Sequence, residues 1–245
     1  MNESVIIKNC QPFYMNPSFD ALPVFQAEDY LTRLYLLQAK MEESDLSHVL
    51  VYADREHFAN MDYLIGHDPR FEEALLVIDR KNHRTLFVGN EGWGHTQSLP
   101  ITVERVLFQS FSLQGQPRDK SKPLHKHLAQ LGIGKDSRLG LIGYKYFIPK
   151  ELTRAESRTD FPMWLIEEIL RLTPKGRLTN VTSFMTGLPH GIRMNLRTAK
   201  EIAYYEQIAE RTAQSVIRMF KLLKPGISEM ELTAQAAMDA FPISA

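Results

Sequence analysis

The 245-residue sequence lacks several features that would assign it to a class of protein at once. Cys10 is its only cysteine, which excludes an internal disulfide or a thiolate zinc site and gives no sign of an oxidising compartment. No apolar run approaches the roughly 20 residues of a membrane-spanning helix, and the apolar stretch near Met1 is too short for a signal peptide. Lys plus Arg and Asp plus Glu number 29 each, so the net charge of zero gives no electrostatic argument for nucleic acid or anionic membranes. We therefore expect a cytoplasmic protein that binds neither.

The short motifs that mark common catalytic sites are also missing. The sequence contains no nucleophile elbow, phosphate-binding loop, dinucleotide fingerprint or zinc-binding His-Glu-x-x-His. His125 and His127 are the only close pair of histidines, and positions two apart on the helix predicted there point in different directions. Gly132 and Gly134 follow a predicted helix rather than a strand, which favours a turn over a phosphate cradle. The residues themselves thus predict no catalytic side chain and no metal site in this chain.

Apolar periodicity predicts helices that alternate with strands after an irregular N-terminal arm over residues 1–25. A continuous apolar run such as Ala74–Asp79 is typical of a strand buried on both faces of a sheet. We predict helices over 28–43, 123–131 and 162–172, a helical turn over 58–64, and strands over 48–52, 74–79, 85–88, 104–113 and 138–144. This pattern indicates an α/β fold with a largely buried mixed sheet.

Two capping boxes lie near the end of the chain. Thr198 with Glu201, and Ser228 with Glu231, each place a hydroxyl at a helix start and a carboxylate three residues later. Between them apolar residues recur at steps of three and four, namely Ile202, Tyr205, Ala209, Ala213, Val216, Phe220 and Leu223. The spacing predicts one long amphipathic helix, which Lys224-Pro225-Gly226 ends before a second helix begins. Turn residues at Gly187-Leu188-Pro189 place the domain boundary there, giving domains of residues 1–188 and 189–245.

Two stretches resemble a known family. Arg197–Ile202 and Pro225–Glu231 are similar to the opening of the catalytic domain in pita-bread metallopeptidases, which include Xaa-Pro aminopeptidases, prolidases and creatinase. Asp54–Gly66 resembles an Asn-x-x-Tyr-Leu-x-Gly stretch in the creatinase-like N-terminal domain of that family. The two matches stand in the family's order and cover the chain from about Glu28 to Ala240. The resemblance implies a creatinase-like α/β domain with helices on both faces of its mixed sheet, followed by the first helices of a truncated α+β pita-bread domain.

The resemblance also implies that the metal site of the parent protein lies outside this chain. The family holds two divalent metal ions (manganese, cobalt or zinc) with two Asp, one His and two Glu, all well downstream of the second helix start. Only 14 residues follow Glu231 in the 245 of this chain, so we expect no cofactor here and no activity from this chain alone. The intact parent is implied to be a homodimeric Xaa-Pro aminopeptidase or dipeptidase that acts on short proline-containing peptides. This part would shape the substrate cleft and the dimer.

Four residues are candidates for substrate contact. Arg55 and His57 belong to a polar cluster directly after a predicted strand, at the edge where ligands bind in α/β sheets. The alternative is that Asp54 and Asn60 make this a locally hydrogen-bonded turn. Trp93 lies between two glycines and is followed by His95 in a predicted loop, which suits a recognition anchor but equally a plug on its own sheet.

Two other functions fit the same scaffold. Creatinase-like and pita-bread domains also form a eukaryotic histone chaperone, so a non-catalytic protein-interaction module is one alternative. A creatinase-type hydrolase is another. Downstream metal ligands in the family order would favour the peptidase, and their loss would favour the interaction module.

Overall fold

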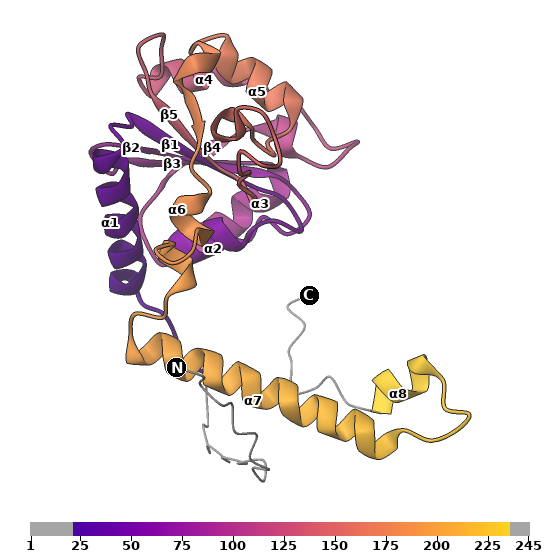
Figure 1. Ribbon diagram of the computed structural model, residues 1–245. Helices are drawn as coiled ribbons and strands as arrows, with labels where there is room; N and C mark the ends of the chain where they lie inside the picture. The colour runs from indigo at the N-terminus through magenta and orange to yellow at the C-terminus, as the bar shows by residue number, and fades with distance from the viewer. Residues whose placement is uncertain (1–21, 236–245) are drawn as a thin grey trace, which may run out of the picture. The chain divides into compact units, whose positions relative to one another are not determined.

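A computed structural model describes residues 22–235, which form two compact units (Figure 1). The larger unit is Phe25–Asn195, and the smaller comprises the described residues 22–24 and 196–235. Most of the predicted N-terminal arm, and Pro242 near the other end, lie outside the described residues. Within residues 22–235, no helix has both the length and the apolar content that crossing a bilayer requires.

The larger unit is built on one six-stranded sheet with the order β4-β3-β2-β1-β5-β6. Only β2 runs against its neighbours, because β1 and β3 both pair with it in antiparallel register while the other pairings are parallel. The strands are β1 (His48–Ala53), β2 (Ala74–Asp79), β3 (Arg84–Val88), β4 (Glu104–Leu107), β5 (Leu139–Ile142) and β6 (Leu178–Asn180). The predicted α/β class and mixed sheet are confirmed.

Helices cover both faces of this sheet (Figure 1). One face carries α1 (Ala27–Glu43), α2 (Ala59–Ile65) and α6 (Ser183–Thr186), and the other carries α4 (Leu124–Gln130) and α5 (Met163–Leu170). Val49 and Val51 of β1 join the first core, whereas Leu50 and Tyr52 join the second. This alternation follows from the two-residue period of a strand and explains why β1 is buried along its whole length.

Short helical segments connect these elements. They are α3 (Asn90–His95) and the 3₁₀ turns η1 (Thr96–Ser98), η2 (Gln109–Phe111), η3 (Ala155–Ser157), η4 (Lys175–Arg177) and η5 (Ile192–Met194). The predicted loop at Gly92–His95 is wrong, because the buried carboxylate of Glu72 accepts the Glu91 and Gly92 amides at 3.1 and 2.9 Å and so caps α3 from outside. The predicted strand over 104–113 is too long. It ends at Leu107, because the chain turns in η2 so that Phe108 and Phe111 both enter the second core.

The smaller unit contains α7 (Ala199–Leu222) and α8 (Glu229–Gln235), as the capping pattern predicts. The Glu201 amide donates to Thr198 Oγ1 at 3.1 Å, and the Glu231 amide donates to Ser228 Oγ at 3.2 Å. Glu231 completes its capping box by accepting the Ser228 amide at 3.0 Å. Several apolar side chains of the predicted stripe are exposed, namely Ile202, Tyr205, Val216, Phe220 and Leu223.

The segment between the predicted boundary and the smaller unit packs within the larger one. Ile192 is completely buried in the first core, and its carbonyl accepts the Tyr63 hydroxyl at 3.4 Å. Arg193 donates to Asn60 Oδ1 at 3.0 Å. The compact unit therefore extends to Asn195.

A protein of residues 22–195 should be more stable than one of residues 22–188 by about 2 kcal/mol, because the shorter protein exposes the pocket that Ile192 fills. Urea denaturation of both measures the difference. Leu188→Ser in the longer protein is the control, since Leu188 is exposed and its loss should change little. Equal stability of the two proteins would instead support a boundary at Leu188.

Candidate functional site

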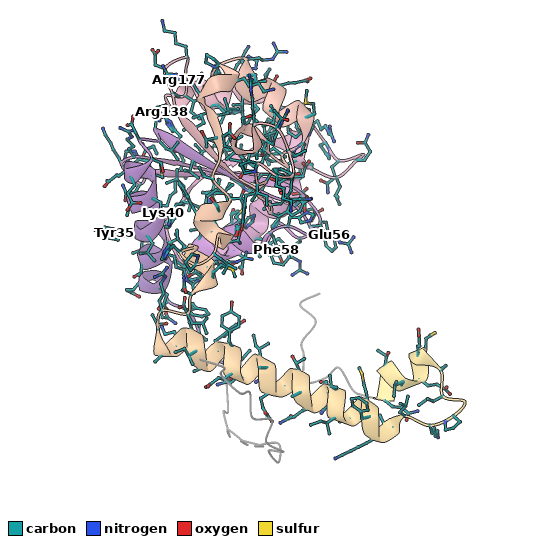
Figure 2. The ribbon with its side chains drawn as sticks, in the orientation of Figure 1. Tyr35, Lys40, Glu56, Phe58, Arg138 and Arg177 are labelled. Atoms are coloured by element: carbon teal, nitrogen blue, oxygen red, sulfur yellow. The ribbon has the colours of Figure 1, made fainter. Side chains whose placement is uncertain are left out.

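The carboxyl ends of five strands meet at one edge of the sheet. Since the chain leaves β1 toward β2 on one side and leaves β5 toward β6 on the other, the topological switch point lies between β1 and β5. Glu72 and Glu73 come to the same edge from the start of β2, which runs the opposite way. In Figure 2, Glu56, just after β1, lies on the opposite side of the unit from Arg138 and Arg177, which precede β5 and β6.

The turn after β1 is ordered by its own contacts. Asp54 Oδ1 accepts the Glu56 and His57 amides at 2.9 and 2.8 Å, and it lies 3.0 Å from His57 Nδ1. Partial burial would raise the pKa of Asp54, but the His57 ring and the two amides hold it below its usual value. The His57 ring in turn stacks on Tyr144 with 3.7 Å between centroids. The local-turn interpretation thus holds for Asp54, and the turn presents His57 in a fixed orientation.

Asn60 does not cap its own turn as the alternative proposed. Its side chain is buried, donates to the Gly143 carbonyl at 2.7 Å and accepts from Arg193, so it ties α2 to the end of β5. Tyr63 lies against the Arg33 guanidinium at 4.1 Å, and Gly66 has a φ of 72° that glycine adopts without strain. The Asn-x-x-Tyr-Leu-x-Gly stretch therefore serves to hold the fold together.

An open hollow of about 420 Å³ lies beside the β1 turn. Arg55 and His57 line it together with Glu72, Glu73 and Phe111. Trp93 and His95 do not line this hollow; both belong to α3, and the Arg105 guanidinium lies 5.0 Å from the centre of the Trp93 ring. The structure thus brings two of the four predicted contact residues together and places the other two elsewhere. Their contact with substrate stays a prediction.

A partly buried pair of Tyr52 and Glu73 lies at this edge, and the sequence alone does not predict it. The Tyr52 hydroxyl donates to Glu73 Oε1, and burial raises the pKa of both groups. The Tyr52 bond lowers the pKa of Glu73, but burial and the nearby Asp54 outweigh it. Glu73 therefore holds a proton to higher pH than an exposed glutamate. The only sequence signal is a glutamate directly before an apolar strand, which is too common to single out.

The described residues offer no donor set for a metal ion, since no three His, Cys, Asp or Glu side chains within 22–235 are grouped to hold one. His125 Nδ1 lies 2.8 Å from Glu168, whereas the His127 ring packs edge-on against Phe87 and Phe108. The two histidines thus point to different partners, as their spacing on a helix predicts.

The carboxyl edge of the sheet can bind and orient a ligand, and Glu73 can hold a proton there.

Solved structures with the same fold are dipeptidases and prolidases. Dipeptidase PepE from Mycobacterium ulcerans matches 88% of this chain with a TM-score of 0.59 and 15% identity, and 50% of its own length is covered. The prolidase from Thermococcus sibiricus matches 85% of this chain with a TM-score of 0.58 and 16% identity, and the match covers 48% of the prolidase. The Xaa-Pro dipeptidase from Bacillus anthracis matches 86% of this chain with a TM-score of 0.55 and 13% identity, and the match covers 48% of the dipeptidase.

No protein-family model matches the sequence, and no curated protein matches it either. The chain spans about half the length of the solved structures it matches, and the match covers roughly their N-terminal half. At 13 to 16% identity the likeness establishes the fold. The resemblance read from the two sequence stretches is thereby confirmed at the level of structure.

Proposed function

We propose that this chain is the N-terminal part of a metal-dependent Xaa-Pro aminopeptidase or dipeptidase. In this proposal it shapes the substrate cleft for short proline-containing peptides, helps to hold a homodimer, and supplies no metal ligand. The observation that supports it most is the match over 85 to 88% of the chain to half-length portions of a dipeptidase, a prolidase and an Xaa-Pro dipeptidase. The order of the two motif stretches along the chain agrees with that match.

The chemistry of the described residues is consistent with this division. Two divalent ions, manganese, cobalt or zinc, need carboxylates and a histidine converging on one point, and residues 22–235 contain no such group. In this proposal the metals are held by other residues of the longer protein. Arg55, His57, Trp93 and His95 are the side chains we propose for contact with substrate or with the partner subunit.

A non-catalytic interaction module remains the second candidate, and one observation favours it. The apolar stripe of α7 exposes aromatic side chains, with Phe220 73% and Tyr205 50% exposed, and such a face can pack against a partner protein. A creatinase-type hydrolase shares the scaffold as well. Two Asp, one His and two Glu downstream of α8 in the longer reading frame would decide for the metal-dependent enzymes.

The proposal predicts that the longer protein releases proline from an Xaa-Pro dipeptide with manganese or cobalt, and that residues 1–245 alone do not. Trp93→Ala in the longer protein should lower kcat/KM about 30-fold, because losing one interface aromatic costs on the order of 2 kcal/mol. Proline release measures both effects, with thermal melts to confirm folding.

Tyr35→Ala is the matched control, since Tyr35 is an exposed aromatic residue of α1, a helix that carries none of the four proposed contact residues. An equal loss in both variants would remove Trp93 from the substrate site. Turnover by residues 1–245 alone, with tightly bound metal, would overturn the proposed function itself.

A further inference from the structure

A second hollow lies on the α4 and α5 side of the sheet edge. Its volume is about 590 Å³, within the range of roughly 300 to 1,000 Å³ typical of small-molecule sites. It is lined by η2, by the segment that leads into α4, and by α5. Glu73 lines both this hollow and the one beside His57.

Aromatic rings form one wall of this second hollow. Trp164 of α5 stacks on Phe108 with 6.5 Å between centroids and an interplanar angle of 23°. It also meets the Phe111 ring edge-on at 5.9 Å. Phe108 and Phe111 are each only 2% exposed, whereas Trp164 is 36% exposed. The core therefore fixes the Trp164 ring from behind and leaves part of it open to a flat apolar group.

Two cations without an ion pair in the described part of the chain line the same hollow. Lys122 and Arg118 line the hollow, and neither forms an ion pair within residues 22–235. Arg118 donates one long bond of 3.4 Å to the Ser112 carbonyl, so most of its guanidinium donors remain available. A carboxylate is the natural ligand for such a pair of cations.

Three glutamates line the hollow and would repel an anion, but two of them interact with neighbouring side chains. Glu168 is held by Arg171 at 2.9 Å and by His125 at 2.8 Å. Glu73 receives the Tyr52 hydroxyl, and burial raises its pKa. Of the three glutamates that line the hollow, only Glu167 has neither an ion pair nor a hydrogen bond among the described residues. Lys122 and Arg118 are the lining cations that no described carboxylate pairs with.

We propose that the hollow binds a small organic carboxylate with an aromatic body, its ring on Trp164 and its carboxylate between Lys122 and Arg118. This inference is independent of the proposed peptidase role, because none of the four residues proposed there for substrate contact lines this hollow. Two cations suit the single charge of a carboxylate better than the several charges of a polyphosphate.

Titration of the chain with 4-fluorophenylacetate, followed by fluorine-19 NMR, tests the proposal. We expect saturable binding with a dissociation constant on the order of 1 mM, as suits a ligand of this size. Lys122→Gln should weaken it about tenfold, because a charge-assisted hydrogen bond is lost. The uncharged analogue 4-fluorophenylacetamide should bind at least about tenfold more weakly for the same reason.

Lys126→Gln is the matched control. Lys126 lies four residues after Lys122 and carries the same charge, but its side chain does not line the hollow. Trp93 and Trp164 are the only tryptophans, so in a Trp93→Phe protein the probe should quench Trp164 fluorescence with the same dissociation constant. This measurement leaves Trp164 in place and so avoids a folding defect. Absence of saturation, equal loss in the two lysine variants, equal affinity for the amide, or unquenched Trp164 would each overturn the proposal.

Discussion

Replacing Gly143 by alanine is expected to lower the free energy of unfolding by about 3 kcal/mol, as overpacking of a rigid site does. A Cβ atom there would lie 2.1 Å from Asp160 Oδ1 and 2.5 Å from Asp160 Cγ. The backbone cannot move aside easily, because its amide donates to Thr182 Oγ1 at 3.0 Å and its carbonyl accepts from Asn60 at 2.7 Å. Chemical denaturation measures the loss.

The double variant Gly143→Ala, Asp160→Ala identifies the cause. Removing the carboxylate takes away the clash, so the second change should restore at least half of the lost stability. Gly134→Ala is the control, because no atom lies within 4 Å of the position its Cβ would take. If the double variant is no more stable than Gly143→Ala alone, crowding against Asp160 is not the reason.

Acidification from pH 6.5 to pH 4 is expected to cost roughly 3 kcal/mol of stability through His67 alone. The side chain is 1% exposed, and its Nε2 has no hydrogen-bond partner among the described residues. Burial lowers the pKa of His67 to about 4; the adjacent Asp68 opposes the shift and His95 adds to it. The unfolded chain therefore takes up the proton first, below a pKa near 6.5. The stability is present above that pH and is lost as pH falls toward 4.

Denaturation curves at several pH values test this with His67→Gln, which cannot take up the proton and should lose less stability over the same range. The comparison is between the two slopes, because burial also lowers the pKa of His48 and of His127. The parent protein therefore loses stability through all three histidines as the pH falls. His190→Gln is the control at an exposed histidine and should keep the parent slope. Parallel slopes for the parent and His67→Gln would show that His67 is not the group responsible.

The local sequence predicts the positions of some residues of the candidate site but not of others. A strand followed by Arg55 and His57 could be placed at the carboxyl edge of a sheet, and both side chains line a hollow there. Trp93 and His95 could not be placed, because α3 forms only where the distant Glu72 caps it. The Tyr52–Glu73 pair joins β1 to the residue directly before β2, 21 positions away, and depends on the register of these antiparallel strands. Nothing in either strand alone reveals it.

The sequence by itself determined those features whose stabilising contacts lie within a few residues. The helix α7 and its Thr198 cap, the Gly66 helix end, and the buried run of β2 all follow from spacing and capping over one or two turns. The order of the motif stretches also indicated the fold that the solved structures share.

Only the tertiary structure decided the strand order, the early end of β4, the helical form of α3, and the place of Glu73 in the lining of two hollows. The physical reason is the same in each case. These features depend on contacts between segments far apart in the chain, such as Phe108 with Trp164 or Asn60 with Gly143, and the energy of such contacts exists only once the sheet has assembled.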